Sequence, residues 1–465
     1  MPDACVKLDY TLACADAVGP HGLAPSDFDS DALARIYDQA RRVAPQWGFT
    51  QLPARLDSAD ALVGLGDTLA KECDDFVVIG IGGSALGNIT LHASLNPPSY
   101  NLASREARGD RPRIHVPDNV DPVLIASLLD TLVPERTCVN VIAKSGSTAE
   151  TLANFLVVRA LLEQGVGAGW TDHVVFTTDP EKGALRALGR ELGIRMLEVP
   201  PNVGGRFSVL SPVGLLSASV EGIEVKALLQ GAQAMLERCQ CADWRANPAF
   251  FNAVLHYLFD VRKGVRMNVM MPYAQSLREI ADWFRQLWAE SLGKCVDRSG
   301  QPIECGLTPI KALGATDQHS QVQLYVEGPP DKFTTFLHVD QFPVTTTITP
   351  AFKDEAAFAY LGGRTLNELL HAEEKATRAA LAKAGRPSVT ISLPAVNAYY
   401  LGQLLFMFEL QTAYAGELYN IDAFDQPGVE QGKIFTYALM GRDGYADARR
   451  ELEGMQLSNP QCVIA

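Results

Sequence analysis

No apolar run in this sequence reaches the length of a membrane-spanning helix, and no low-complexity tract interrupts it. A bilayer span needs about 20 consecutive apolar residues, so a membrane protein is not expected. The N-terminus, MPDACVKLDYTLACADAVG, also lacks the basic region and continuous apolar core of a signal peptide. With 47% hydrophobic and 20% charged residues, the composition is that of an ordinary globular protein. We therefore expect a cytoplasmic protein of two or three domains.

The number and spacing of cysteines and the low positive charge argue against disulfide frameworks, zinc sites and surfaces that bind nucleic acid or anionic membranes. Nine cysteines, an odd number, are scattered along the 465 residues, and the close pair Cys239-x-Cys241 has no matching second pair. This spacing predicts neither a disulfide framework nor a zinc site, and it fits a reducing compartment. The formal net charge of −14 at pH 7 disfavours nucleic acid and anionic membranes, which bind clustered Lys and Arg. An anionic small substrate is compatible with this charge where cations are concentrated locally.

Buried strand patterns alternate with helical patterns from residue 76 onward. A first series of strands is predicted at residues 76–81, 113–116, 138–143, 173–177 and 195–199. A helix-rich stretch follows, and a second series is predicted at residues 265–271, 322–326, 333–339 and 389–393. Such alternation is typical of βαβ units around a parallel sheet. The sequence therefore predicts two α/β domains of similar kind, followed by a helical region from about residue 395.

The stretch Phe76–Leu91, FVVIGIGGSALGNITL, carries the first chemical signal. A strand that turns through glycines into a helix directs free backbone N–H groups and the positive end of the helix dipole at one point, where phosphate binds well. Ser84 adds a hydroxyl donor. The letters GIGGSA also satisfy the relaxed dinucleotide pattern, for which Glu106 or Asp110 would have to supply the acidic partner. A glycine-rich turn that only packs helix on sheet is the third interpretation, and the loop alone leaves all three open.

Residues 138–152, CVNVIAKSGSTAETL, repeat this order of buried strand, polar loop and helix. The loop holds one lysine and three hydroxyls ahead of the helix: Lys144, Ser145, Ser147 and Thr148. One hydroxyl would be enough for a helix cap, whereas three hydroxyls beside a lysine favour a phosphate cradle. No Walker-type GxxxxGK[ST] motif occurs, so a nucleoside triphosphate is not the expected ligand.

The segment PNVGGRFS, residues 201–208, places Arg206 after two glycines. An arginine in a turn is usually a surface residue. The apolar residues at 207–216 indicate instead that Arg206 lies at a buried edge, where its charge needs a partner or a substrate.

A helix is predicted over Ser276–Gly293, with Ser276 and Glu279 forming a capping box and Gly293 ending it. Three residues at spacings of three and four share one face of this helix: Trp283, Gln286 and Glu290. A glutamate on a helix is usually just solvated, but a tryptophan on the same face indicates a covered cleft. A carboxylate held there suits a general base.

Two further polar segments hold single residues of interest. GATDQH, residues 314–319, places His319 in a loop ahead of a predicted strand, although a lone histidine is most often structural. FDQPGVEQGK, residues 424–433, is a turn entering a helix, with Lys433 about one turn inside it. Apolar Ile434 and Phe435 follow, which is unusual around a lysine that serves only solubility.

In this order, the motifs resemble the glucose-6-phosphate isomerase family, and its compact bacterial type in particular. The resemblance is carried by residues 80–87 and 144–150, NVGGRFSVLSPVG, AESLGK, GATDQH and FDQPGVEQGK, which span about residues 76 to 433. It implies two sugar-isomerase (SIS) α/β domains, each a doubly wound and mainly parallel sheet, and a C-terminal helical arm. The expected division is a helical extension over residues 1–70, SIS domains over 71–220 and 221–394, and the arm over 395–465.

The resemblance also implies a role for each motif in isomerising glucose 6-phosphate and fructose 6-phosphate. Glu290 would move the proton between C1 and C2, Arg206 would stabilise the enediolate, and His319 would open the sugar ring. The remaining expected site residues are Lys433 assisting ring opening, Ser84, Lys144, Ser145, Ser147 and Thr148 at the phosphate, and Gly83, Gly205, Gln286 and Gln426 around the sugar. No metal or redox cofactor is implied. In the family the histidine comes from the neighbouring subunit, so a homodimer is expected, acting in glycolysis and gluconeogenesis.

Other functions stay open at this point. An isomerase acting on both glucose and mannose 6-phosphates would differ in small residues around C2, which the motifs do not distinguish. A non-catalytic sugar-phosphate sensor would be expected to lack a catalytic group, yet Glu290, Arg206, His319 and Lys433 are all present. A dinucleotide oxidoreductase is disfavoured, because it gives the second cradle and the FDQPGVE block no role.

Overall fold

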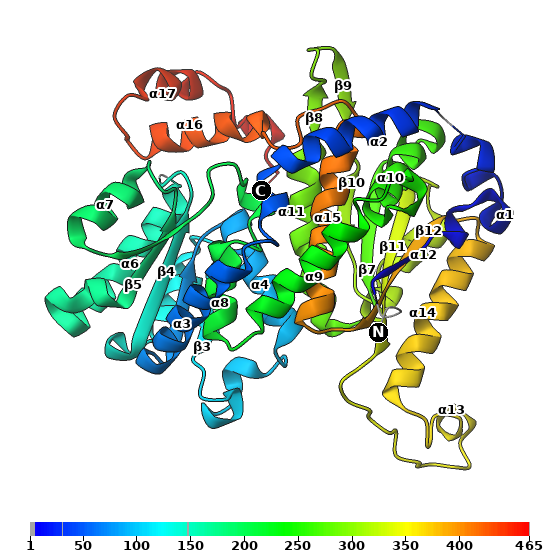
Figure 1. Cartoon of the computed structure of the whole chain (residues 1–465), viewed down its shortest axis with the longest axis horizontal. Coiled ribbons are helices and arrows are strands. Elements are labelled where there is room, and N and C mark those ends of the chain that lie inside the picture. Colours follow the sequence, from blue (N-terminus) through cyan, green and yellow to red (C-terminus); the bar gives the residue numbers. More distant parts are fainter. Residues whose placement is uncertain (1–4, 30, 147, 465) are drawn as a thin grey trace.

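The computed structural model describes residues 5–29, 31–146 and 148–464, and it contains two five-stranded sheets flanked by helices (Figure 1). The first sheet is parallel throughout, with the order β3-β2-β4-β5-β6. Its strands are β2 Asp75–Ile79, β3 Arg113–His115, β4 Thr137–Ala143, β5 Val174–Thr178 and β6 Arg195–Glu198. The first series of predicted strands is therefore confirmed, with bounds that differ by at most two residues.

Alternate residues of β2 contact opposite layers of the first domain. Phe76 and Val78 belong to the large apolar core, whereas Val77 and Ile79 join a separate cluster around Phe155. Successive side chains of a strand point to opposite faces, so a strand covered on both sides must be apolar at every position. This is why β2 appears in the sequence as a continuous apolar run.

The second sheet has the order β1-β12-β11-β7-β10, with β1 antiparallel to β12 and the other pairs parallel. Its strands are β1 Lys7–Asp9, β7 Met267–Pro272, β10 Thr308–Lys311, β11 Lys332–Gln341 and β12 Ser388–Ala395. Read from its other edge, the four parallel strands β10-β7-β11-β12 follow the same chain order as β3-β2-β4-β5, while the fifth place holds the antiparallel β1 instead of a parallel strand such as β6. Among the parallel strands of each sheet, the first in the chain, β2 or β7, lies between the second and the third, which is the doubly wound arrangement. The predicted fold class is confirmed.

One predicted strand is wrong. Residues 322–326 form most of helix α12, Val322–Glu327. Tyr325 is buried in the same cluster as Val269 of β7, and Val322 and Val326 pack against that cluster. Residues 322, 325 and 326 have the spacing of one helix face. The sheet positions are filled instead by β10 and β1, two short strands that the sequence did not predict.

Helices flank both sheets, and several of them carry residues of the site. In the first half of the chain they are α1 Ala15–Val18, α2 Asp31–Val43, α3 Leu56–Glu72, α4 Leu86–Leu95, α5 Pro122–Leu129, α6 Ala149–Val166, α7 Ala184–Leu192, α8 Pro212–Val220 and α9 Val225–Arg238. The remainder are α10 Pro248–Lys263, α11 Arg278–Leu292, α12, α13 Ala356–Ala359, α14 Leu366–Lys383, α15 Ala398–Leu418, α16 Glu430–Leu439 and α17 Ala446–Glu453. A hairpin of β8 Lys294–Val296 and β9 Pro302–Cys305 projects beyond α11. None of the described helices is long and apolar enough to cross a bilayer.

Helix α15 runs through the middle of the molecule beside α9 and α10, and it is buried along nearly its whole length (Figure 1). Gly402 allows its close approach to α9, because a Cβ there would lie 2.0 Å from the carbonyl oxygen of Leu228. In contrast, α16 and α17 pack chiefly on each other and lie above the first domain at the upper left of Figure 1. The region from residue 395 thus begins with a core helix, and the division of the chain into domains stays a prediction.

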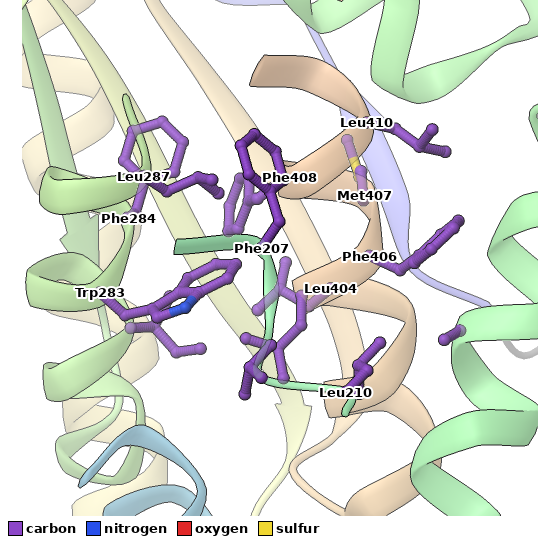
Figure 2. Close-up of a cluster of buried hydrophobic side chains, with 14 of the residues drawn as sticks. Phe207, Leu210, Trp283, Phe284, Leu287, Leu404, Phe406, Met407, Phe408 and Leu410 are labelled. Carbon is purple, nitrogen blue, oxygen red and sulfur yellow. The ribbon is translucent and has the colours of Figure 1, made fainter. Parts of the chain in front are cut away.

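An apolar cluster lies between α11, α15 and the segment that follows Arg206 (Figure 2). Phe284 of α11 and Phe408 of α15 have ring centroids 4.9 Å apart. Phe207 stacks on Phe49 with a centroid distance of 5.0 Å, and both are fully buried. Because Phe207 adjoins Arg206 and α11 carries Glu290, this packing fixes the two charged residues relative to each other.

Candidate active site

Two glycine-containing turns meet closely at the centre of the site. The turn η6, Gly82–Ser84, follows β2, and the turn η11, Gly205–Phe207, carries Arg206. A Cβ on Gly83 would lie 2.3 Å from the carbonyl carbon of Gly205 and 2.6 Å from the amide nitrogen of Arg206. Only glycine allows this approach of two backbones. Gly82 has a φ of +55°, and a Cβ there would lie 2.8 Å from Nε2 of Gln286, so α11 joins the same junction.

Arg206 is almost entirely enclosed, with 3% of its side chain exposed. Its NH1 donates to Oε1 of Glu290 at 3.2 Å and to Oε1 of Gln426 at 2.9 Å. Its Nε donates to Oγ of Ser291 at 2.7 Å, and NH2 donates to the carbonyl of Ala423 at 2.6 Å. Burial lowers the pKa of Arg206, and the negative charge of Glu290 opposes that shift. The prediction that this charge is buried and partnered is confirmed.

Glu290 lies in the last turn of α11, one turn beyond Gln286. Nε2 of Gln286 donates to Oε2 of Glu290 at 2.9 Å, and Oε1 receives the Arg206 bond. The Glu290 side chain is 26% exposed, so part of the carboxylate faces open space. The described hydrogen-bond partners of the Glu290 carboxylate are thus the polar side chains of Gln286 and Arg206, whereas Trp283 on the same predicted face is buried.

The start of α11 differs from the prediction. The helix begins at Arg278, after a short turn over Gln275–Leu277, and among the described residues no side chain at the N-cap position bonds to its first N–H groups. The expected capping box of Ser276 and Glu279 is therefore wrong. The chain enters α11 through this 3₁₀ turn instead of through a capping box.

The hydroxyl-bearing loops lie next to each other, because β2 and β4 are paired parallel strands and their carboxyl ends share one edge. Oγ of Ser145 lies 3.4 Å from Oγ1 of Thr148. Thr148 occupies the N-cap position of α6, yet its hydroxyl makes no capping bond within the described chain. This arrangement favours the cradle interpretation over the simple cap. Ser147 lies outside the described residues, and Ser84 is half-buried at the end of η6.

The Lys144 ammonium bonds to backbone carbonyls of a distant segment. Its Nζ donates to the carbonyl oxygens of Pro201 at 2.6 Å and Val203 at 2.8 Å. Burial lowers the pKa of the Lys144 ammonium. These bonds tie the β4 loop to the segment that leads into Arg206.

His319 and Lys433 are both exposed in this chain. His319 ends the turn Thr316–His319 after β10 and is exposed. Lys433 is exposed on α16 and pairs with Glu430 at 2.7 Å. Within the described contacts, neither side chain bonds to Arg206 or Glu290. From the FDQPGVEQGK block, Gln426 and the backbone of Asp425 reach the pair instead.

Several residues at the site were not singled out from the sequence. The hydroxyl of Ser291 accepts a hydrogen bond from Nε of Arg206. Lys294 is 7% exposed and bonds to the end of α11 and to Asp425. Its position directly after Gly293 in the AESLGK motif was the available signal.

The comparisons with known proteins agree with one another. The family model described as phosphoglucose isomerase matches residues 56–447. The glucose-6-phosphate isomerase of Carboxydothermus hydrogenoformans is 53% identical over 457 residues, covering 96% of this chain and 97% of that protein. The glucose-6-phosphate isomerase of Rubrobacter xylanophilus is 48% identical over 400 residues, covering 86% of this chain and 90% of that protein.

Solved structures give the same result. A hypothetical protein from Thermus thermophilus superposes with a TM-score of 0.81 at 37% identity, covering 94% of this chain and 100% of that one. A glucose-6-phosphate isomerase from Chlamydia trachomatis shares the fold, with a TM-score of 0.77 at 23% identity and coverage of 91% and 88%. On the extent of these matches, the chain belongs to the phosphoglucose isomerase family.

Proposed function

We propose that this chain is an aldose–ketose isomerase that interconverts glucose 6-phosphate and fructose 6-phosphate. The observation that carries the proposal is the contact between the enclosed guanidinium of Arg206 and the partly open carboxylate of Glu290. The contact lies beside the loops at the carboxyl ends of β2 and β4. In doubly wound folds, ligands bind at this edge of the sheet.

The reaction needs a base beside C1 and C2 of the open-chain sugar and a cation for the enediolate. Glu290 takes the proton from C2 of the aldose and returns it to C1, while a second proton moves between the two oxygens. C2 is oxidised and C1 reduced within one molecule, so the electrons balance without a partner. Arg206 stabilises the negative enediolate, and its fixed hydrogen bonds mean that it need not reorient during the reaction.

The remaining residues hold the substrate in this proposal. The phosphate is bound by Ser84, Ser145, Ser147 and Thr148 at the two helix N-termini. Lys144 contributes backbone and charge, with its ammonium bound to the segment that precedes Arg206. The sugar is lined by Gly83, Gly205, Gln286 and Gln426.

Ring opening requires His319, with Lys433 assisting, and we propose that His319 acts in the site of a neighbouring subunit in a homodimer. Its exposure on the surface of its own chain supports this arrangement. Exposed apolar side chains in the excursion between β11 and α14, such as Phe352 at 69% and Tyr360 at 68%, also favour self-association. We place the enzyme in the cytoplasm, in glycolysis and gluconeogenesis.

The direct test follows fructose 6-phosphate by NMR as it converts to glucose 6-phosphate, with purified protein in the presence of a chelator and without a nicotinamide cofactor. We expect conversion to equilibrium from either sugar phosphate, with solvent deuterium entering at the carbon that gains the proton. Free fructose serves as the matched control and should react far more slowly. Absence of conversion with folded protein would contradict the proposal.

A further inference from the structure

Lys294 lies just beyond α11, and its ammonium bonds to oxygen atoms of the protein. Its Nζ is 2.8 Å from the carbonyl oxygen of Ser291 and 3.4 Å from that of Glu290. It is also 3.0 Å from the carbonyl oxygen of Asp425 and 3.3 Å from the carboxylate of that residue. An ammonium has three donors, and these acceptors occupy them. Lys294 therefore contacts the elements that carry the site and does not need the substrate as a partner.

The carbonyl oxygen of Asp425 connects two cations. It accepts from Nζ of Lys294 at 3.0 Å and from NH2 of Arg206 at 3.1 Å. Arg206 in turn bonds to the carboxylate of Glu290. The backbone carbonyl of Glu290, in the last turn of α11, accepts from Nζ of Lys294. The contacts form a closed ring through Lys294, Asp425, Arg206 and Glu290.

We propose that Lys294 is a positioning residue of the isomerase, which fixes the Glu290 carboxylate relative to the Arg206 guanidinium. The inference rests on the proposed function. Lys294 holds the two backbone carbonyls at the end of α11, and through Asp425 it also holds the segment that receives Arg206. Displacing one reacting group by about 1 Å can reduce a rate about a hundredfold, so such a clamp affects turnover without touching the substrate.

A helix C-cap is the simpler role for a lysine at this position. The last carbonyls of a helix lack intrahelical partners, and a cation near them is stabilising. A cap accounts for the bonds to Glu290 and Ser291. It does not account for the double contact with Asp425, which lies 131 residues further along the chain. The clamp and the cap therefore make different predictions about catalysis.

The experiment compares Lys294→Met with wild type and with Lys311→Met. Lys311 is the matched control, because it also binds α11, through Asp282 at 2.8 Å, but is 50% exposed and has no described contact with the four residues of the ring. For Lys294→Met we expect kcat to fall about 10- to 100-fold with KM changed by less than about threefold. Affinity for a phosphorylated sugar acid that mimics the planar enediolate, measured by calorimetry, should fall by the same factor as kcat/KM. Lys311→Met should keep kcat within about twofold.

Lys294→Arg provides the second variant. Its charge is kept, but a planar guanidinium cannot direct three donors from one atom at these carbonyls, so we expect kcat between the Met variant and wild type. Wild-type kcat in Lys294→Met, or a loss confined to KM or to melting temperature, would overturn the clamp and leave a cap. Failure of both variants to fold would do the same, since it would show that the residue maintains the fold. Wild-type turnover tests the proposed function separately, because the clamp is judged only from ratios to wild type.

Discussion

The guanidinium of Arg206 and the carboxylate of Glu290 lie 3.2 Å apart but differ in exposure, at 3% and 26% of their side chains. The arginine is held by a serine hydroxyl, an amide oxygen and two backbone carbonyls, so its orientation is set before any substrate arrives. The carboxylate keeps an open side. This asymmetry supports the proposed roles, with Arg206 as the fixed electrostatic group and Glu290 as the group that moves the proton.

Glu290→Gln should abolish the base while keeping size and hydrogen bonding. We expect kcat to fall by about 10²–10⁴ or more, with substrate affinity nearly unchanged. Steady-state kinetics and calorimetric binding of the substrate check this. Glu279→Gln is the matched control, since Glu279 lies on the same helix and its side chain is similarly exposed, at 28%. More than about a tenth of wild-type kcat in Glu290→Gln would exclude general-base catalysis by this residue.

Ser145→Ala combined with Thr148→Val should weaken recognition of the phosphate group. Both side chains belong to the loop after β4, at the N-terminus of α6. We expect KM for fructose 6-phosphate to rise, while any trace activity on free fructose barely changes, because only the phosphosugar uses the cradle. Kinetics on the two substrates with the same preparation make the comparison. Equal losses on both would mean that the hydroxyls serve the fold.

Gly83→Ala should separate two turns that are in backbone contact. The added Cβ would lie 2.3 Å from the carbonyl carbon of Gly205, and backbone there cannot move aside as a flexible side chain can. We expect a destabilisation of about 1–3 kcal/mol and a large loss of kcat/KM, since Arg206 would shift. Gly204→Ala is the control, because its Cβ would meet only a ring carbon of Phe207 at 3.8 Å. Thermal melting and steady-state kinetics are measured for both variants. Equal melting temperatures and equal kcat/KM in Gly83→Ala and Gly204→Ala would contradict the close approach of the two turns.

His338 should contribute a pH-dependent part of the stability. Its Nδ1 lies 2.5 Å from the Glu374 carboxylate, and this hydrogen bond raises the pKa of His338 above its ordinary 6.5. A raised histidine pKa stabilises the fold below the ordinary value, and that stability is lost as pH rises through the folded pKa. As the pH rises from about 6 to about 9, the melting temperature of wild type should therefore fall by more than that of His338→Gln. The same change of melting temperature with pH in both proteins would show that His338 makes no such contribution.

The homodimer proposal predicts complementation between two inactive variants. If His319 reaches the neighbouring site, mixing Glu290→Gln chains with His319→Ala chains creates hybrids with one intact site. Roughly a quarter of wild-type activity should return, because about half of the dimers are hybrids and each has one of two sites working. Subunit exchange is verified by mass spectrometry of differently tagged chains. Exchange without recovery would place His319 in the site of its own chain.

The sequence by itself determined the elements whose signal is local. The loops after β2 and β4 and the end of α11 at Gly293 follow from apolar period and glycine placement over a few residues. The burial of Arg206 could also be predicted, since its apolar neighbours leave little water to solvate the charge. The prediction failed where a short pattern fits two structures, as in α12, because only packing against β7 selects the helical period there.

Only the tertiary structure decided which distant groups are partners. The Lys144 ammonium bonds to the carbonyls of Pro201 and Val203, and Arg206 bonds to Gln426, 220 residues away. β1, near the N-terminus, likewise completes the sheet of the second domain. Periodicity in a sequence reports which face of an element is buried, but not what covers it. The partner of a buried charge is set by how whole elements pack, and so the ring through Lys294, Asp425, Arg206 and Glu290 exists only in the folded chain.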